Sequence, residues 1–205
     1  MGAMEAIYVA MEVKQLILDD PFWVDVKFFV EFVEPICDML CYADTDGPCL
    51  GEIYENMDSM CERIRSIVDV KDPNLWVQLE TIIHGRWNKL NNPLHMAAYP
   101  VNKKWYDPST GRRHPSQDRE VVKGFMAAVK FFYSFTEKAS DIRGQSAQFS
   151  CRRGVFASHA SLTDRRKKKD PIDWWWLHGN DTIELQQFAI RLLGQVTSLG
   201  CSSCF

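Results

Sequence analysis

The sequence predicts a mostly α-helical fold, and three observations support this prediction. Apolar residues recur every three to four positions over several long stretches, which is the period of an α-helix. Aspartates and Asp-Pro pairs precede several of these stretches, where helices take their N-caps. No convincing strand is present, because the β-branched clusters at 68–70 and 121–122 stand at the edges of predicted helices. A chain of 205 residues can bury a core of its own.

The N-terminal half contains three long predicted helices after an extension at 1–20. The first covers 22–42, with Asp20 and Pro21 at its start, and Pro35 should kink or break it. A turn at 45–48 leads into a second helix over 51–68. Asp72 and Pro73 then open a third helix that continues to Trp87. These elements begin a helical region that we expect to extend to residue 139.

The C-terminal half begins with a short apolar helix at 93–98 and a polar connection at 107–117. Asp118 should cap a helix over 119–138. The segment 140–169 loses the helical period and is rich in Arg and Lys, which predicts a basic flexible linker. A last helix is expected over 182–197, within a C-terminal region at 170–205, and Asp181 or Thr182 should cap it.

Composition and charge exclude several classes of protein. The net charge of −3 and the pI of about 6.0 argue against a nucleic-acid binder that acts through bulk charge. The first residues lack the basic and uninterrupted apolar regions of a secretory signal, and no run approaches the roughly 20 apolar residues of a membrane span. Seven cysteines without such a signal indicate free thiols in a reducing compartment.

Several sequence blocks, in their order and spacing, resemble the hAT superfamily of DNA transposases. The blocks are Phe22-Trp23 with Glu34-Pro35, Gly51 to Asp58, Ile82 to Trp87, Pro93 to Tyr99, and Asp173 to Leu193. Arg86 and Trp87 form a landmark of the third block. The last block, which contains Trp174-Trp175-Trp176, is the most specific.

The resemblance implies a lobe from the helical insertion domain of a ribonuclease-H-like transposase, followed by a truncated dimerisation region. It implies no complete α/β core. In the family, three acids hold divalent metal for DNA strand transfer, and the first two precede the matched region. The third, a Glu, would follow the small-residue run that here ends at Phe205. The resemblance therefore implies a chain without enzymatic activity.

The residues themselves indicate no catalytic or metal-binding group. Acid pairs at Asp44 with Asp46 and at Asp69 with Asp72 are better explained as caps and solvated loop acids. The Cys201-x-x-Cys204 pair lacks the two further ligands of a zinc site. We therefore expect no cofactor, no metal and no small-molecule substrate. For Arg86 and Trp87, the alternative to a functional landmark is that the Trp87 ring packs into the core while Arg86 caps a helix or pairs with an acid.

Two segments indicate interactions with other molecules. Three successive tryptophans precede an amphipathic helix, which is typical of a protein–protein interface, although the same residues could form the chain's own core. The residues proposed for this interface are Trp174, Trp175, Trp176, Leu185, Phe188, Leu192 and Leu193. The second segment is the basic run Arg165, Arg166, Lys167, Lys168 and Lys169. This run could serve nuclear import or nucleic-acid contact, or be a solvated linker.

The leading functional hypothesis is a catalytically inactive, hAT transposase-derived protein that acts through protein–protein interaction or dimerisation. Its partner would be itself or another hAT-derived protein, and its location the nucleus, with the cytoplasm as the alternative. One alternative function is a DNA-binding or regulatory fragment that makes weak nucleic-acid contact through the basic segment. Another is a non-functional transposon remnant. Contact with a membrane is not expected.

Overall fold

A computed structural model of the chain describes residues 2–45, 47–107, 112–134, 137–167 and 170–195. Within these ranges the regular structure is helical and no strand occurs, which confirms the predicted mostly α-helical class. The α-helices are α1 (Ala3–Ile17), α2 (Asp20–Ala43), α3 (Leu50–Lys71), α4 (Pro73–Leu90), α5 (Pro93–Ala98), α6 (Arg119–Tyr133), α7 (Glu137–Ser150), α8 (His159–Arg166), α9 (Pro171–His178) and α10 (Ile183–Leu193). Short 3-10 turns are η1 (Tyr99–Val101), η2 (Lys103–Tyr106), η4 (Pro115–Gln117) and η5 (Gly154–Ala157).

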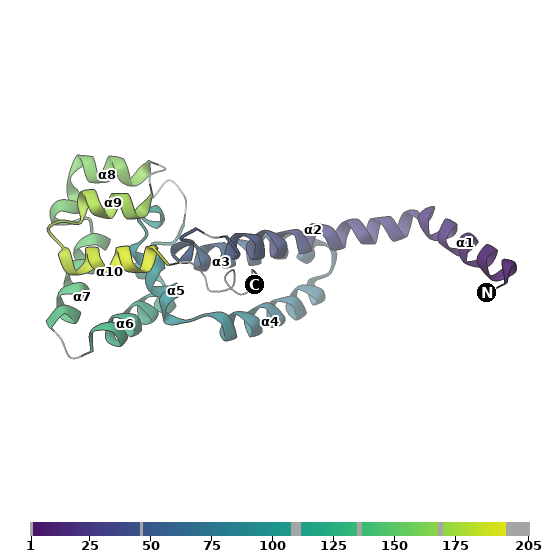
Figure 1. The fold of residues 1–205 in the computed structure, drawn as a ribbon, viewed down its shortest axis with the longest axis horizontal. Helices are drawn as coiled ribbons and strands as arrows, with labels where there is room; N and C mark the ends of the chain where they lie inside the picture. Colours follow the sequence, from purple (N-terminus) through teal and green to yellow (C-terminus); the bar gives the residue numbers. More distant parts are fainter. Residues whose placement is uncertain (1, 46, 108–111, 135–136, 168–169, 196–205) are drawn as a thin grey trace.

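The molecule consists of a compact lobe, a helical stem and a projecting arm (Figure 1). We use lobe for α5 to α10, arm for residues 3–24, which comprise α1 and the first residues of α2, and stem for the rest of α2 with α3 and α4. The arm points away from the lobe, so the chain is elongated (Figure 1). Among the described residues, no helix combines the length and the hydropathy needed to cross a membrane.

The stem is built around α3, which packs against α2 on one side and α4 on the other. Its core contains Met60, Ile64 and Val68 from α3 with Trp76 and Ile83 from α4. Asp72 caps α4 as predicted, because its carboxylate accepts hydrogen bonds from the backbone N–H groups of Asn74 and Leu75.

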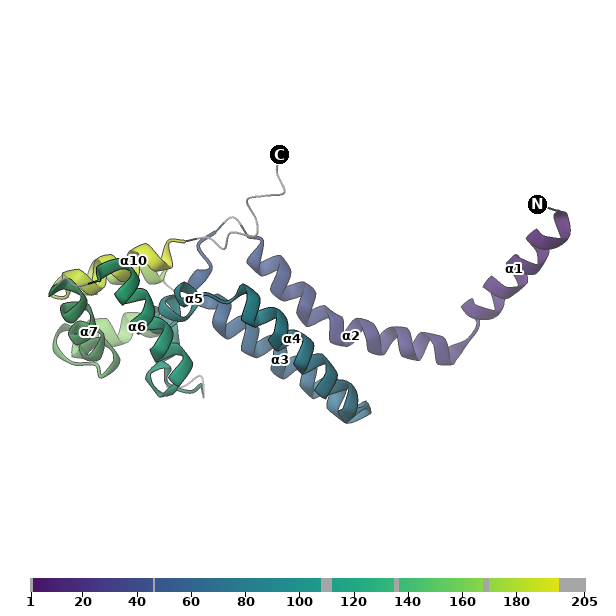
Figure 2. The same ribbon diagram turned by 90° about the horizontal axis from the view of Figure 1, so that it is seen from below.

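Helix α2 runs through Pro35 as one element, so the predicted break does not occur. Proline removes one helical hydrogen bond and favours a bend, and α2 follows a curved path in Figure 2. Pro35 is one of the two buried residues of α2 and faces α3. Packing of the proline ring therefore compensates for the lost hydrogen bond.

The lobe encloses the largest core of the described chain. Ala97 from α5 and Val101 from η1 meet Val129 from α6, Phe149 from α7 and Phe188 from α10 there. Helix α6 begins after Asp118, which caps it as predicted, but it ends at Tyr133, earlier than the expected residue 138. Helix α10 likewise ends at Leu193 instead of reaching about 197.

The described part of the segment predicted as a basic flexible linker, residues 140–167, is helical and packed into the lobe. It contains most of α7, then η5 and α8, and it buries Ile142, Phe149 and Phe156 completely or almost completely. These apolar residues are widely spaced in a polar sequence, so they produce no clear helical period. Their burial in the lobe nevertheless stabilises the short helices, as tertiary packing does for most helices.

Candidate functional site

The candidate site is an apolar groove on the stem, at the end nearest the lobe. It has a volume of about 450 Å³ and lies between α2, α3 and α4. Its lining residues are Ile36, Met39, Leu40, Ala43, Ile53, Met57, Met60, Ile82, Ile83, Arg86, Trp87, Leu90, Asn92 and His95. Most of these side chains are aliphatic or aromatic, as in pockets that bind apolar groups.

The groove exists because α2 and α4 both pack on α3 without closing over it. In Figure 2 α3 and α4 lie alongside each other, and α2 runs next to them. Met57 and Met60 from α3 line the groove between them. The rim carries exposed apolar side chains, Leu40 from α2 and Ile82 and Leu90 from α4. Methionine is flexible and can adapt to an incoming group.

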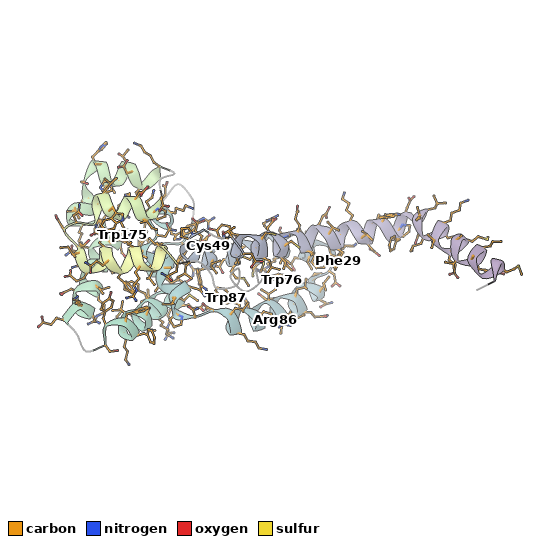
Figure 3. All side chains as sticks on the ribbon, in the orientation of Figure 1. Phe29, Cys49, Trp76, Arg86, Trp87 and Trp175 are labelled. Atoms are coloured by element: carbon orange, nitrogen blue, oxygen red, sulfur yellow. The ribbon has the colours of Figure 1, made fainter. Side chains whose placement is uncertain are left out.

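Arg86 and Trp87, the pair noted in the sequence, both line this groove (Figure 3). Trp87 is half-buried and stacks on His95 at a centroid distance of 5.9 Å. Burial lowers the pKa of His95, and its Nδ1 accepts a hydrogen bond from the backbone N–H of Asn92. Arg86 is exposed, and within the described part of the chain no salt bridge joins it to an acid. The pair therefore combines a packed ring with an available cation.

The outer face of α2 continues from this groove toward the arm. We define the outer face as Trp23, Val26, Phe29, Val30, Val33, Cys37 and Leu40. Trp23, Phe29, Val30 and Leu40 are each about half exposed, between 49% and 57%. Leu40 belongs both to this face and to the groove. The two features therefore form one continuous apolar surface.

Helix α1 extends that apolar surface, and sequence reasoning missed it. The helix exposes Ile7, Tyr8, Val9, Met11, Val13, Leu16 and Ile17. Apolar side chains lie on almost every side of α1, and such a helix is normally buried. The sequence does show an apolar run within 1–20. Glu12 and Lys14 interrupt it, however, so it matches neither a secretory signal peptide nor a membrane span.

The C-terminal residues predicted to bind a partner are instead mostly core residues of the lobe. Trp174 and Trp175 are fully buried, and their indole N–H groups donate to the backbone oxygens of Ser161 and Val101. Figure 3 shows Trp175 within the lobe. Trp176 differs, because 61% of its surface is exposed. Three successive positions on a helix point in three directions, and only the third points outward here.

The α10 stripe is also buried inside its own chain. Leu185, Phe188, Leu192 and Leu193 pack in the lobe core. Phe188 forms ring contacts with Phe125, Phe132 and Tyr133 at centroid distances of 5.8 to 6.2 Å. These residues are not available to a partner, so the expectation that they form a dimer interface is corrected to an intramolecular role.

Of the basic run, the structure describes the side chains of Arg165 and Lys167, and Arg165 is not a solvated cation. Arg165 is 4% exposed, and its guanidinium lies over the rings of Phe149, Trp174 and Tyr106 at 4.4, 5.1 and 5.3 Å. Its burial lowers the pKa of Arg165 to about 10. Lys167 pairs with Asp164. The side chain of Arg166 and all of Lys168 and Lys169 lie outside the described structure.

A second, polar cleft of about 550 Å³ lies on the other flank of α3. Its lining includes Tyr54, Glu55, Asp58, Glu62 and Asp118. Desolvation, followed by repulsion from Asp118 and Glu62, raises the pKa of Asp58 to about 6. Arg112 pairs with Glu55 at its edge. Apart from this pair the cleft gathers neighbouring acids, and its described lining has no arrangement that indicates a reaction.

The remaining chemical candidates do not converge. Among the residues that the structure describes, no group of three or more His, Cys, Asp or Glu side chains could hold a metal ion. Asp46 and the Cys201–Cys204 pair lie outside those residues. No protein-family model, no curated protein and no solved structure matches the chain. The apolar groove and the outer face of α2 are therefore the candidate interaction surfaces of the described chain.

Proposed function

We propose that this chain is a non-enzymatic interaction protein that associates with itself through the arm and the outer face of α2. The observation that supports this proposal is the continuous apolar surface formed by α1, the outer face of α2 and the groove. Monomeric soluble proteins rarely expose contiguous apolar patches of more than a few hundred Å². Four exposed large apolar residues of the outer face are Trp23, Phe29, Val30 and Leu40, and α1 adds more.

This proposal keeps the function inferred from the sequence and changes the surface that performs it. Association through α10 would require the lobe core to open, whereas association through α1 and α2 requires no change in the lobe. The hAT relationship and the nuclear location are parts of the proposal that rest on the sequence blocks alone. Weak contact with DNA through the basic run is the alternative proposal, and it would rest on cations other than the buried Arg165.

Sedimentation equilibrium of the purified full chain tests the proposal. We expect a concentration-dependent monomer–dimer equilibrium in the micromolar range, and we expect Phe29→Ser to shift it toward monomer. Phe131→Ser is the matched control, because Phe131 is a phenylalanine of the lobe that is 79% exposed. A chain that stays monomeric at a hundred micromolar, or an equal loss of association in both variants, would contradict the proposed function.

A further inference from the structure

We infer that a second copy of this chain covers the groove, and that the two α2 helices pair antiparallel with Trp23 of each copy seated against Leu40 of the other. The inference rests on the proposed self-association and specifies its geometry. Three observations favour this arrangement: the extent of the outer face, the positions of its charges, and the place of the lobe.

The extent of the outer face determines the register. Its apolar residues run from Trp23 to Leu40, so an antiparallel pair buries the whole face when Trp23 lies opposite Leu40 of the second copy. The same register places Val26 opposite Cys37 and Val30 opposite Val33. Because Leu40 lines the groove and Trp23 is 49% exposed, the exposed edge of the indole would enter the open end of the groove while its N–H donates to the backbone oxygen of Ile17. A groove of about 450 Å³ can receive a side chain of that size.

The charges beside the face also match in the antiparallel arrangement. Lys27, which also pairs with Glu31 of its own helix at 3.8 Å, comes close to Glu34 of the second copy, which lies 4.0 Å from Arg63 of its own chain. The twofold symmetry repeats this contact. Asp19 and Asp20, which precede Trp23, approach the groove end where Arg86 has no salt bridge within the described residues. The side chain of Asp19 makes no capping hydrogen bond to α2. Each copy therefore offers two acids to an available cation of the other.

Two other arrangements could cover the groove, a parallel pair of α2 helices and the chain's own α1. The position of the lobe argues against the first, and the length of α1 argues against the second. The lobe follows the C-terminal end of the stem (Figure 1), so a parallel pair would bring both lobes together and leave both grooves open. The chain's own α1 cannot cover the groove either. Folded back along α2, its 15 residues would extend for about 22 Å. The groove begins at Ile36, about 24 Å from the start of α2.

Disulfide trapping distinguishes these arrangements. In Val26→Cys, mild oxidation should link the new thiol to Cys37 of the second copy, as identified by peptide mass mapping. The link cannot form within one chain, because positions 26 and 37 are eleven residues apart on one helix, about 16 Å, beyond the reach of a disulfide. Val24→Cys is the control, because residue 24 is 61% exposed but lies outside the outer face, and it should not link to Cys37.

A second measurement tests whether the indole of Trp23 binds in the groove of the second copy. Trp23→Ala should weaken dimerisation at least about tenfold, as truncation of a central aromatic anchor does. Trp176→Ala should leave it unchanged, because Trp176 is exposed on the lobe. If the wild-type chain dimerises but links Cys37 to Cys37, or if Trp23→Ala has no effect, the antiparallel arrangement is overturned while the proposed self-association stands. A strictly monomeric chain would instead remove the proposed function itself.

Discussion

Two glycines in helices of this chain have opposite surroundings. A Cβ added to Gly124 in α6 would lie 2.1 Å from Cβ of Met96 in α5, whereas one added to Gly85 in α4 would have nothing within 4 Å. Gly124 therefore permits the close approach of α5 and α6. Gly85 serves no such contact, although glycine weakens a helix by about 1 kcal/mol relative to alanine.

We therefore predict opposite effects for the same substitution. Gly124→Ala should lower the free energy of unfolding by about 1–3 kcal/mol, because the overpacked contact forces the helices apart. Gly85→Ala should raise it by about 0.5–1 kcal/mol. Urea denaturation followed by circular dichroism measures both. Equal effects of the two substitutions would show that α5 and α6 do not pack this closely.

For single residues, the sequence-based predictions were correct where the chemistry of one residue and its backbone neighbours decides the local structure. Asp72 and Asp118 were identified as N-caps because an aspartate before a helical pattern needs only its own backbone neighbours. The role of Arg165 was not predictable, because its ring contacts come from residues 9 to 59 positions away in the sequence. In the sequence, a run of cations indicates solvated side chains. Only the fold shows that aromatic rings surround one of these cations, Arg165.

Among the helices, α10 is the element whose role changed most between sequence and structure. We expect Phe188→Ala to lower the free energy of unfolding by about 3–5 kcal/mol, because it removes a buried ring from the lobe core. Ile183→Ala in the same helix should cost far less, since Ile183 is 53% exposed. Chemical denaturation of the two variants provides the comparison. If the Phe188→Ala chain keeps its full stability but no longer self-associates, α10 forms the dimer interface and not the lobe core.

The helices that were predicted well are the long amphipathic ones with clear starts. Helices α2, α3, α4 and α6 fall close to their expected ranges. The helices α1, α7 and α8 were missed for different reasons. Helix α1 has too many apolar residues to show one face, while α7 and α8 have too few. An amphipathic stripe such as that of α10 also has the same appearance whether it faces its own core or a partner.

The elongated shape gives a prediction for the whole molecule. A compact chain of 205 residues has a radius of gyration of about 17 Å. Together α1 and α2 contain 39 residues, or roughly 60 Å of helix if aligned. Small-angle X-ray scattering at dilutions where the chain is monomeric should give a clearly larger radius, and deletion of residues 2–18 should reduce it. A value near 17 Å that is insensitive to the deletion would mean that the arm folds back.

For the molecule as a whole, the sequence predicted the class of the fold but not its division into stem, lobe and arm. The predicted boundaries at 139 and 169 fall inside the lobe, because α7 and α8 pack with α9 and α10. The groove could not be foreseen either. It arises from the angle at which α2 and α4 leave α3, and residue periodicity does not encode that angle.

The hydrogen bond from the Trp175 indole to Val101 joins residues 74 positions apart, and this separation has a consequence for how the chain folds. Stem contacts join helices that are consecutive in sequence, so they form without closing long loops and should form early. The lobe core must wait for α9 and α10, the last described helices to leave the ribosome. During synthesis the apolar side chains of α5 and α6 therefore stay uncovered after the stem is complete. A chaperone that binds exposed apolar side chains therefore has its largest binding surface on this chain during that interval.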